Sequence, residues 1–347
     1  MKSVAAYQAT AADQPLAKAT IERRDLRPDD VMIEIEYAGI CHSDIHTVRD
    51  EWGGCKYPLA PGHEIIGIVS EVGADVTKAK VGDRVGVGCL VDSCMECEYC
   101  LAGDQHYCEN GAVGTYNAID LHDGTVTQGG YSTHVPVRED FVIQIPEGMD
   151  PAAATPLLCA GITTYSPLVN WNAGPGKKVA VVGMGGLGHV AVKIAAAMGA
   201  EVSVFSHSLR KKDDGLAYGA TGYYSTAEED FHKPHRRGFD IIIDTVSVPH
   251  DINQYLKMLR PNGAHVLLGL PEGGMDIDPR MLIGGRHTLA GSNIGGIRET
   301  QEMIDFCAEH GVLSEIELIS ADQINEAYDR VVASDVRYRF VIDAKTF

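Results

Sequence analysis

The stretch Lys178-Val-Ala-Val-Val-Gly-Met-Gly-Gly-Leu-Gly188 decides the fold of the second half of this 347-residue chain. An apolar run predicts a strand, and the pattern G-x-G-x-x-G follows it at Gly183, Gly185 and Gly188. The alanine-rich segment Leu187 to Met198 then predicts a helix that stops at Gly199. A glycine-rich turn between a strand and a helix is typical of a dinucleotide-binding βαβ unit.

Downstream of this turn, further apolar strands alternate with helical segments. Strand patterns recur at Glu201–Phe205, Asp240–Asp244 and His265–Gly269, and a helical pattern spans Ile252–Leu259. Such alternation predicts an α/β fold with a doubly wound parallel sheet. We assign residues 153–289 to this Rossmann dinucleotide-binding domain.

Upstream of residue 152 the chain is β-rich. Alternating or apolar runs at Val31–Tyr37, Glu64–Val69 and Phe141–Ile145 predict short strands punctuated by Gly, Pro and Asp. The tail adds a helix at Glu299–His310 and a last strand at Arg339–Asp343. We assign residues 1–152 and 290–347 to a second, catalytic domain.

Composition and charge exclude several classes of protein. The chain is 45% hydrophobic, which suffices to bury a core and excludes predominant disorder. The net charge of −19, with no basic stripe, argues against a nucleic-acid partner. No apolar run approaches the roughly 18 residues of a membrane helix, and the start lacks a secretory apolar segment, so we expect a cytoplasmic protein without a membrane partner.

Four of the nine cysteines lie within fifteen residues, at Cys94, Cys97, Cys100 and Cys108. Four thiolates in one loop can close a tetrahedral shell around zinc, and such a closed site supplies stability rather than chemistry. An iron–sulfur cluster is an alternative, although its motif continues with a shorter gap and a proline. The remaining alternative is a chance cluster of reduced cysteines.

A second, dispersed set of metal-binding side chains consists of Cys41, His63 and Cys159. Two thiolates and one imidazole match an open catalytic zinc site, in which the fourth position is left for water or substrate. Taken alone, a cysteine such as Cys159 in an apolar helix is more often an ordinary core residue than a metal ligand.

These motifs together resemble the zinc-dependent medium-chain alcohol dehydrogenases. The pattern runs Gly62-His63-Glu64, Gly67, Gly73 and Val76, and the four-cysteine loop follows it. The stretches Ala38–His46 and Leu157–Tyr165 are most similar to the cinnamyl alcohol dehydrogenase branch. The resemblance covers essentially the whole chain and implies that the β-rich domain is GroES-like.

The resemblance also implies roles for individual residues. Cys41, His63 and Cys159 would be the catalytic zinc ligands. Glu64 would support these ligands or serve as an alternative fourth ligand, and Asp44 would be the acid that orients His63. With the four-cysteine loop, this gives two zinc ions per chain. Ordinary surface acids are the alternative for Glu64 and Asp44. Ser43 and His46 stand at the positions of the family's proton relay, and His42 lies near, as an alternative contact for the pyrophosphate.

The end of the second Rossmann strand bears on cofactor choice. An NAD site normally has an acid there, but this chain reads Phe205-Ser-His-Ser-Leu-Arg-Lys211. Hydroxyls and cations suit a 2′-phosphate, which favours NADP(H); a solvated helix start is the alternative. The residues expected to bind the cofactor are Thr163, Gly183, Gly185, Gly186, Leu187, Gly188, Ser206, His207, Ser208, Lys211, Ser292 and Ile294.

The sequence thus predicts reversible hydride transfer between primary alcohols and aldehydes, mainly as aldehyde reduction. Trp52, Leu90 and Ile294 are candidate walls of a pocket for aromatic or medium aliphatic substrates. The alternatives are a polyol or sugar dehydrogenase on the same scaffold and a non-catalytic, dinucleotide-binding redox sensor. By resemblance we expect a homodimer, in which the segment Gly284–Gly296 supplies an edge strand.

Overall fold

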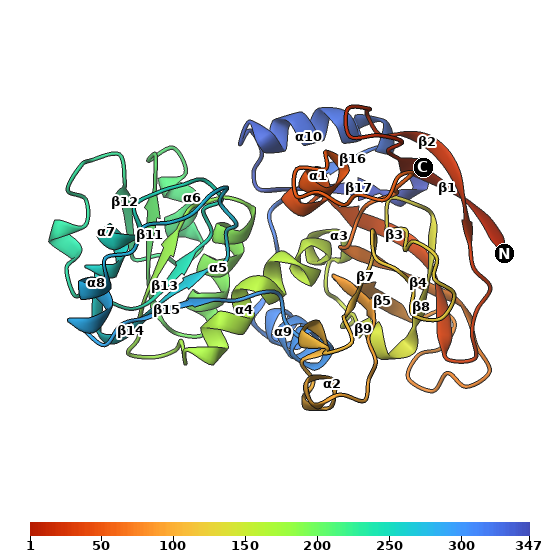
Figure 1. Cartoon of the computed structure of the whole chain (residues 1–347), viewed down its shortest axis with the longest axis horizontal. Coiled ribbons are helices and arrows are strands. Elements are labelled where there is room, and N and C mark those ends of the chain that lie inside the picture. Colours follow the sequence, from red (N-terminus) through yellow and green to blue (C-terminus); the bar gives the residue numbers. More distant parts are fainter. The chain divides into compact units, whose positions relative to one another are not determined.

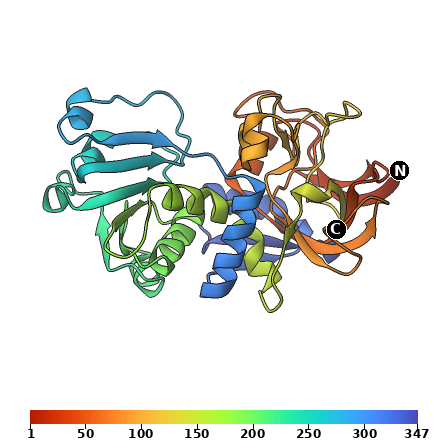
Figure 2. The same cartoon turned by 90° about the horizontal axis from the view of Figure 1, so that it is seen from below.

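The computed structural model describes residues 1–347 and divides them into two compact units (Figure 1, Figure 2). Unit 1 comprises Met1–Cys159, Gly295–Ala308 and Leu313–Phe347, and unit 2 comprises Ala160–Ile294 and Glu309–Val312. The domain boundaries proposed from sequence, after residues 152 and 289, lie a few residues earlier. The difference at the first boundary arises because residues 151–158 contact strands of the unit 1 sheet.

Unit 2 contains a six-stranded sheet in which every neighbouring pair is parallel. The strand order is β12-β11-β10-β13-β14-β15, so the first strand, β10, lies inside the sheet. The chain adds β11 and β12 on one side of β10, then crosses over and adds β13, β14 and β15 on the other side, as in a Rossmann fold. The central strands are apolar along almost their whole length because both faces of such a sheet are covered. The bounds are α4 (Ala160–Asn170), β10 (Lys178–Val182), α5 (Gly186–Ala197), β11 (Glu201–Ser206), α6 (Lys212–Ala217), β12 (Gly222–Ser225), β13 (Phe239–Asp244), α7 (Ile252–Leu256), β14 (Leu259–Leu267), α8 (Pro279–Ile283) and β15 (Thr288–Gly291).

Unit 1 is built on a seven-stranded sheet with the order β16-β17-β3-β4-β5-β9, and β8 pairs with β3. All of its pairs are antiparallel except β16 with β17. Two small sheets, β1-β2 and β6-β7, complete it. The bounds are β1 (Lys2–Gln8), β2 (Ala17–Arg23), β3 (Asp30–Gly39), β4 (Ile65–Val72), β5 (Arg84–Val87), β6 (Leu90–Asp92), β7 (Val113–Gly114), β8 (His134–Arg138), β9 (Ile143–Gln144), β16 (Ile316–Ile319) and β17 (Arg339–Asp343).

Unit 1 also contains short helices, and two of them, α1 and α10, were not predicted from the sequence. Helix α1 (His42–Val48) follows β3 directly and carries three of the predicted site residues. Helix α10 (Ile324–Val332) buries Ile324, Ala327, Tyr328 and Val331, whose i, i+3, i+4, i+7 spacing is that of an amphipathic helix. The remaining helices are α2 (Glu98–Ala102), α3 (Pro151–Ala154) and α9 (Ile297–His310).

The predicted strand at residues 141–145 is shorter in the structure than expected. Residues Glu139–Phe141 form a turn of 3-10 helix, which leaves only β9 in the sheet. The α/β fold class, with one β-rich part and one Rossmann-like part, is confirmed.

No single helix of the chain is long and apolar enough to cross a membrane, and only one bent pair, Pro151–Leu158 with Ala160–Asn170, passes by length and composition together.

Candidate functional site

The glycine-rich loop of unit 2 links β10 to α5. Gly183 has a φ of +91°, and a Cβ there would lie 2.7 Å from Oγ1 of Thr245, so no other residue fits without strain. A Cβ on Gly188 would lie 2.1 Å from the Gly183 carbonyl oxygen, which shows how closely the helix packs on the turn. A Cβ on Gly185 would meet nothing within 4 Å. The loop therefore leaves open space beside the start of α5, where backbone N–H groups favour a phosphate.

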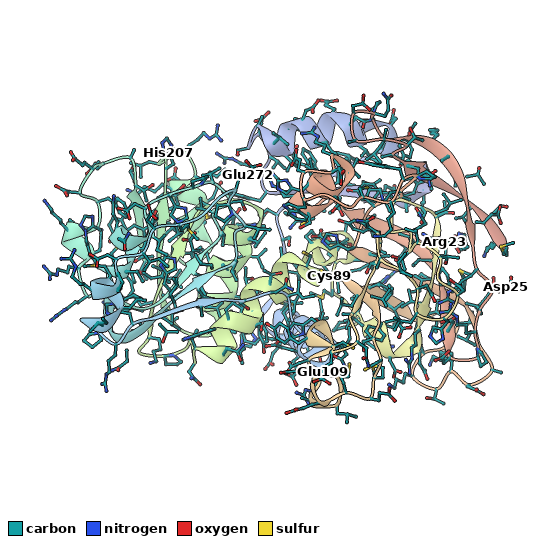
Figure 3. The ribbon with its side chains drawn as sticks, viewed as in Figure 1. Arg23, Asp25, Cys89, Glu109, His207 and Glu272 are labelled. Atoms are coloured by element: carbon teal, nitrogen blue, oxygen red, sulfur yellow. The ribbon has the colours of Figure 1, made fainter.

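The predicted 2′-phosphate residues lie at the end of β11, which is the neighbour of β10. Ser206 is the last residue of β11 and is half-buried, whereas His207 (labelled in Figure 3) and Ser208 are exposed. The Lys211 ammonium reaches the glycine loop and donates to the Met184 carbonyl oxygen at 3.2 Å. No carboxylate stands at the strand end itself; the first acids after it in the sequence, Asp213 and Asp214, are in the first turn of α6.

The other predicted cofactor residues of unit 2 lie on separate segments. Thr163 is buried on α4, and Ser292 and Ile294 follow β15. Ile294 has a φ of +40°, which is rare for a β-branched residue. Backbone strain of this kind often accompanies functional positions.

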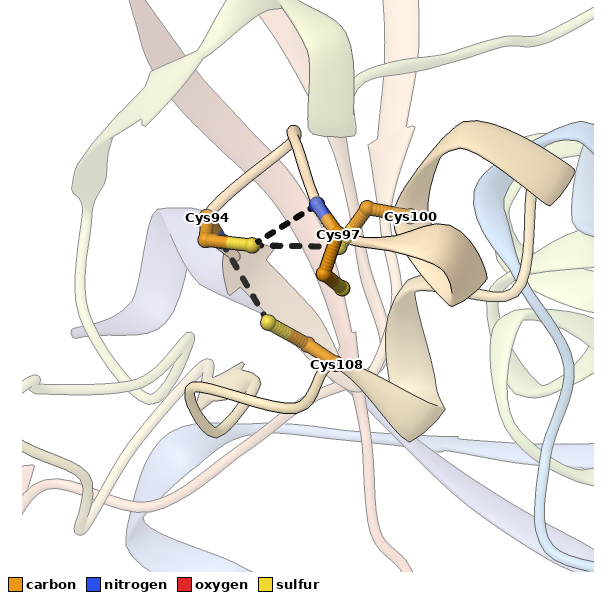
Figure 4. A group of neighbouring side chains, drawn as sticks. All are labelled: Cys94, Cys97, Cys100 and Cys108. Atoms are coloured by element: carbon orange, nitrogen blue, oxygen red, sulfur yellow. Dashed lines mark hydrogen bonds between the residues drawn. The ribbon is translucent and has the colours of Figure 1, made fainter.

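The four clustered cysteines of unit 1 converge on one point (Figure 4). Their sulfur atoms all lie within 4.8 Å of one another, and the Cys94 and Cys100 sulfurs are 3.9 Å apart. A zinc ion with bonds of about 2.3 Å needs tetrahedral sulfurs about 3.8 Å apart, so the arrangement fits zinc. Backbone N–H groups of Glu96 and Cys97 lower the pKa of Cys94 to about 6, which favours the thiolate that a metal requires.

The dispersed set meets in the interior of unit 1. One ligand atom each from Cys41, His63, Glu64 and Cys159 lies within 4.8 Å of the others, and all four residues are buried. Cys41 caps the N-terminus of α1, His63 precedes β4, and Cys159 ends the 3-10 turn Thr155–Leu158. The Cys41 and Cys159 sulfurs are 3.9 Å apart, a spacing that also fits zinc. All nine cysteines are free thiols in the structure.

Asp44 fixes the orientation of His63. The fully buried carboxylate lies 3.0 Å from Nδ1 of His63 and accepts hydrogen bonds from the backbone N–H groups of Cys41 and Gly62. The Tyr131 hydroxyl donates to it at 3.3 Å. With Nδ1 engaged, Nε2 is the imidazole nitrogen left for a metal. This is the arrangement expected for Asp44 from the resemblance.

Glu64 is restrained by Arg339, a residue that sequence reasoning missed. The Arg339 guanidinium donates to Oε1 of Glu64 at 2.5 Å and to the Ile40 carbonyl oxygen at 2.8 Å. Burial raises the pKa of Glu64 to about 8 even against the attraction of Arg339. Oε2 of Glu64 is buried without a hydrogen-bond partner, and a Cβ on Gly39 would lie 2.0 Å from it. Only a glycine at position 39 leaves room for this carboxylate.

Helix α1 and the loop after it hold the predicted relay. The Ser43 hydroxyl is 3.7 Å from the Cys41 sulfur. The His46 ring stacks between His42, at 5.5 Å, and Trp52, at 4.8 Å, and its Nδ1 pairs with the Glu51 carboxylate. Glu51 carried no motif that marked it in the sequence.

The candidate pocket residues of unit 1 differ in exposure. Trp52 is half-exposed, whereas Leu90 is buried on β6. Cys89 (labelled in Figure 3) comes directly before Leu90, and a hydrogen bond with the Cys159 thiol lowers the pKa of Cys89. Its position was not expected from sequence, because no spacing rule connects residues 89 and 159.

Comparisons with known proteins agree with this geometry. Residues 27–147 match the family model described as alcohol dehydrogenase GroES-like domain, and residues 186–309 match the model described as zinc-binding dehydrogenase. The chain is 60% identical to NADP-dependent alcohol dehydrogenase C 1 of Mycolicibacterium smegmatis, over 99% of this chain and 98% of that one. It is 50% identical to aldehyde reductase YahK of Escherichia coli, over 100% and 99%. A cinnamyl alcohol dehydrogenase structure from Sorghum bicolor, 42% identical, superposes with a TM-score of 0.96 over 99% and 98% of the two chains.

Proposed function

This chain belongs to the family of zinc-binding alcohol dehydrogenases, and we propose that it catalyses reversible, NADP(H)-dependent hydride transfer between primary alcohols and aldehydes, mainly as aldehyde reduction. The observation that carries the proposal is the buried set of Cys41, His63 and Cys159, with Asp44 orienting the imidazole. The relatives named NADP-dependent alcohol dehydrogenase and aldehyde reductase support the reaction, and the second name supports the reductive direction.

The residues present fit two zinc ions per chain. Cys41, His63 and Cys159 would hold a catalytic ion, and Cys94, Cys97, Cys100 and Cys108 a structural one. When bound, the catalytic zinc supplies Lewis acidity toward the substrate oxygen, and NADP(H) supplies or accepts the hydride. Arg339 holds one oxygen of Glu64 and thereby restrains the carboxylate near the ligands.

The proton of the alcohol needs a path out of the buried site. Ser43 and His46 on α1 would provide it, with the Ser43 hydroxyl nearest the thiol ligands and the His46 imidazole farther along the helix. The Glu51 carboxylate engages Nδ1 of His46, so Nε2 is the nitrogen that would exchange the proton.

The preference for NADP(H) rests on the strand end at Ser206. Ser206, His207, Ser208 and Lys211 offer hydroxyls and a cation, and no carboxylate occupies the strand end to bind the ribose of NAD. Hydrogen bonds to a charged group contribute roughly 1.5–3 kcal/mol each. About two such contacts would give at least roughly a hundredfold preference for NADPH over NADH in catalytic efficiency.

The proposed substrate class is supported by an aromatic and an apolar side chain of unit 1. Trp52 and Leu90 would form walls for aromatic or medium aliphatic aldehydes, and Ile294 of unit 2 stays a prediction. A polyol or sugar dehydrogenase would call for NAD and a polar pocket. A non-catalytic redox sensor would not call for an ordered relay beside an intact ligand set.

A homodimer is also part of the proposal. Strand β15 forms one edge of the parallel sheet, and its outer side has no strand partner within the chain. Such an edge could pair with the same strand of a second copy across a two-fold axis. The molar mass in solution, measured by light scattering, tests this directly.

The decisive experiment is a steady-state assay of the zinc-loaded enzyme with cinnamaldehyde, aliphatic aldehydes, polyols and the matching primary alcohols, each with both cofactors. We expect the highest catalytic efficiency with an aldehyde and NADPH. Turnover of polyols with NAD would favour the sugar dehydrogenase instead. Tight dinucleotide binding without turnover of any compound would favour the sensor.

A further inference from the structure

The hydroxyl of Tyr223 is a buried polar group without a partner. Tyr223 lies on β12 and is only 5% exposed, and its hydroxyl oxygen has no hydrogen-bond partner in the structure. Buried hydroxyls are normally hydrogen-bonded, and a buried hydroxyl without a partner lowers the stability of the fold. Such a group is often explained by a ligand that bonds to it or to its neighbours.

Strand register places Tyr223 next to Ser206. β11 and β12 run parallel, with Val204 opposite Tyr223 and Ser206 opposite Ser225. Because side chains alternate along a strand, Tyr223 and Ser206 share one face of the sheet and are diagonal neighbours. Burial raises the pKa of Tyr223 and the Ser206 hydroxyl partly lowers it again, so the two hydroxyls are close, although they do not meet the geometry of a hydrogen bond.

The Tyr223 ring is fixed against helix α6. A Cβ on Gly215 of α6 would lie 2.7 Å from Cδ2 of Tyr223, so the ring packs directly on the helix backbone. The same Cβ position is 3.7 Å from the Met184 side chain of the glycine loop. The ring therefore packs on α6 close to the glycine loop, on the face of the sheet that it shares with Ser206.

The surrounding charges suit an anion, with one exception. The Lys211 ammonium lies on the Met184 carbonyl oxygen, at the glycine loop. Asp214 of α6 is near enough to raise the pKa of Tyr223, so one negative charge opposes the cation. Because Asp214 offsets part of the positive charge of Lys211, neutral hydroxyl donors would add attraction for a phosphate at this place.

Resting on the proposed function, we propose that Tyr223 is a positioning residue for recognition of the 2′-phosphate of NADP(H): its hydroxyl donates to Oγ of Ser206, and Ser206 in turn donates to the phosphate. A phosphate dianion only accepts hydrogen bonds, so Ser206 must present its proton to it. A donor on Oγ leaves that proton free for the ligand and polarises the O–H bond toward it. NADH has no 2′-phosphate and gains nothing from this chain of donors.

The test compares binding of NADPH and NADH to zinc-loaded Tyr223→Phe, measured as dissociation constants from nicotinamide fluorescence. We expect the NADPH dissociation constant to rise about three- to tenfold, the usual scale of one hydrogen bond, and the NADH constant to stay unchanged. The melting temperature should not fall, because the hydroxyl is unpartnered without cofactor. Tyr224→Phe is the matched control: it removes a hydroxyl from the adjacent ring, which stacks on Phe205 on the other face of the sheet, and should change neither constant.

A double-variant cycle shows whether Tyr223 acts through Ser206. Once Ser206→Ala is present, adding Tyr223→Phe should weaken NADPH binding no further. Independent, additive losses would overturn the inference, and so would equal weakening of NADPH and NADH, which indicates a merely structural ring contact. If the native enzyme prefers NADPH and Tyr223→Phe keeps the full preference, the inference alone fails. If the native enzyme binds both cofactors equally, the proposed NADP(H) dependence fails with it.

Discussion

The two proposed metal-binding clusters of unit 1 would use the same ligand chemistry in opposite ways. Cys94, Cys97, Cys100 and Cys108 come from one loop with a single short helix, α2, and their partners are mostly each other and nearby backbone N–H groups. Cys41 and Cys159 are 118 residues apart, and they meet His63 in a fully buried place. The first cluster is local and partly exposed, and the second exists only in the folded chain.

The difference explains why the second cluster is held by buried charged side chains from distant segments of the chain. Four thiolates spaced along one loop satisfy a tetrahedral ion by themselves, which leaves no position for a substrate. An open site must instead be kept in shape by its surroundings. Asp44 orients His63, and Arg339 restrains Glu64, both through buried hydrogen bonds. The local cluster should therefore act on stability, and the dispersed cluster on turnover.

The largest expected effect is loss of turnover in His63→Ala. Removing the imidazole deletes one of three ligands of the open site, and Lewis-acid activation is worth several kcal/mol, so kcat/KM should fall by at least about a thousandfold. The melting temperature should stay near that of the native enzyme, and metal analysis should give one zinc per chain instead of two. A variant that keeps two zinc ions and native turnover would remove the distinction between the clusters.

Cys97→Ser should show the opposite pattern. Loss of a closed structural ion commonly costs more than roughly 3 kcal/mol of folding free energy, equivalent to a melting temperature lower by about 10 °C. At low temperature the folded fraction should turn over at nearly the native rate, because the open site is intact. Calorimetry and initial rates on the same sample check both halves. An unchanged melting temperature would show that the four thiolates are not a metal site that supports folding.

The same contrast marks how far sequence reasoning reached. The four-cysteine spacing is local, so the sequence alone indicates a closed shell, and the G-x-G-x-x-G turn after an apolar strand indicates the Rossmann part just as directly. Strand alternation located β3, β4, β10, β11 and β13 because hydrophobic periodicity is itself a local property. The ligand set Cys41, His63 and Cys159 came with support from family resemblance.

The supporting residues could not be found this way. Arg339 and Glu64 are 275 residues apart, and no spacing rule links them. Glu51 contacts His46 only because α1 ends and the chain turns back, and α1 itself has too few residues for a clear periodic pattern. Tyr223 looks like an ordinary strand residue until the register with β11 is known. Long-range pairing decides all of these contacts.

Asp44→Asn tests the dispersed cluster with a smaller expected effect than His63→Ala. Asparagine keeps the size of the side chain but loses the charge that holds His63, and changes of this kind typically reduce metal affinity or activity ten- to a hundredfold. We expect faster loss of one zinc ion to a chelator, while the structural zinc is released at the native rate. Asp92→Asn is the matched control, since Asp92 is a buried acid that accepts from the backbone N–H of Ser93 beside the four-cysteine loop. If Asp44→Asn and Asp92→Asn lose zinc to the chelator at the same rate, Asp44 has no special role in holding the metal.

A third buried acid, Asp244 of unit 2, tests whether an aspartate paired with histidine contributes to stability where no metal site is proposed. It lies at the end of β13 with Oδ2 2.8 Å from Nε2 of His250 and 2.9 Å from Nε2 of His265. Burial raises its pKa, but the hydrogen bonds from the two histidines outweigh burial and bring it to about 2. Asp244 in turn raises the pKa of His250 above its usual value. The cluster has the same acid–imidazole contact as Asp44 and His63 but contains no thiolate.

The smallest predicted effect is therefore a pH dependence of stability in Asp244→Asn. A carboxyl whose pKa falls from 3.8 to about 2 on folding contributes about 2 kcal/mol above pH 4, and this contribution is lost as the pH falls toward 2. A histidine whose pKa rises on folding contributes fully below pH 6.5, and its contribution is lost as the pH rises through the raised value. The difference in unfolding free energy between the native enzyme and the variant should thus be largest between about pH 4 and 6.5 and shrink on both sides. Denaturant unfolding from pH 3 to 9 measures it, and because zinc loss in acid affects both proteins alike, the difference isolates Asp244. A difference that does not vary with pH would mean that Asp244 acts by packing alone, unlike the carboxylate that contacts the proposed metal ligand His63.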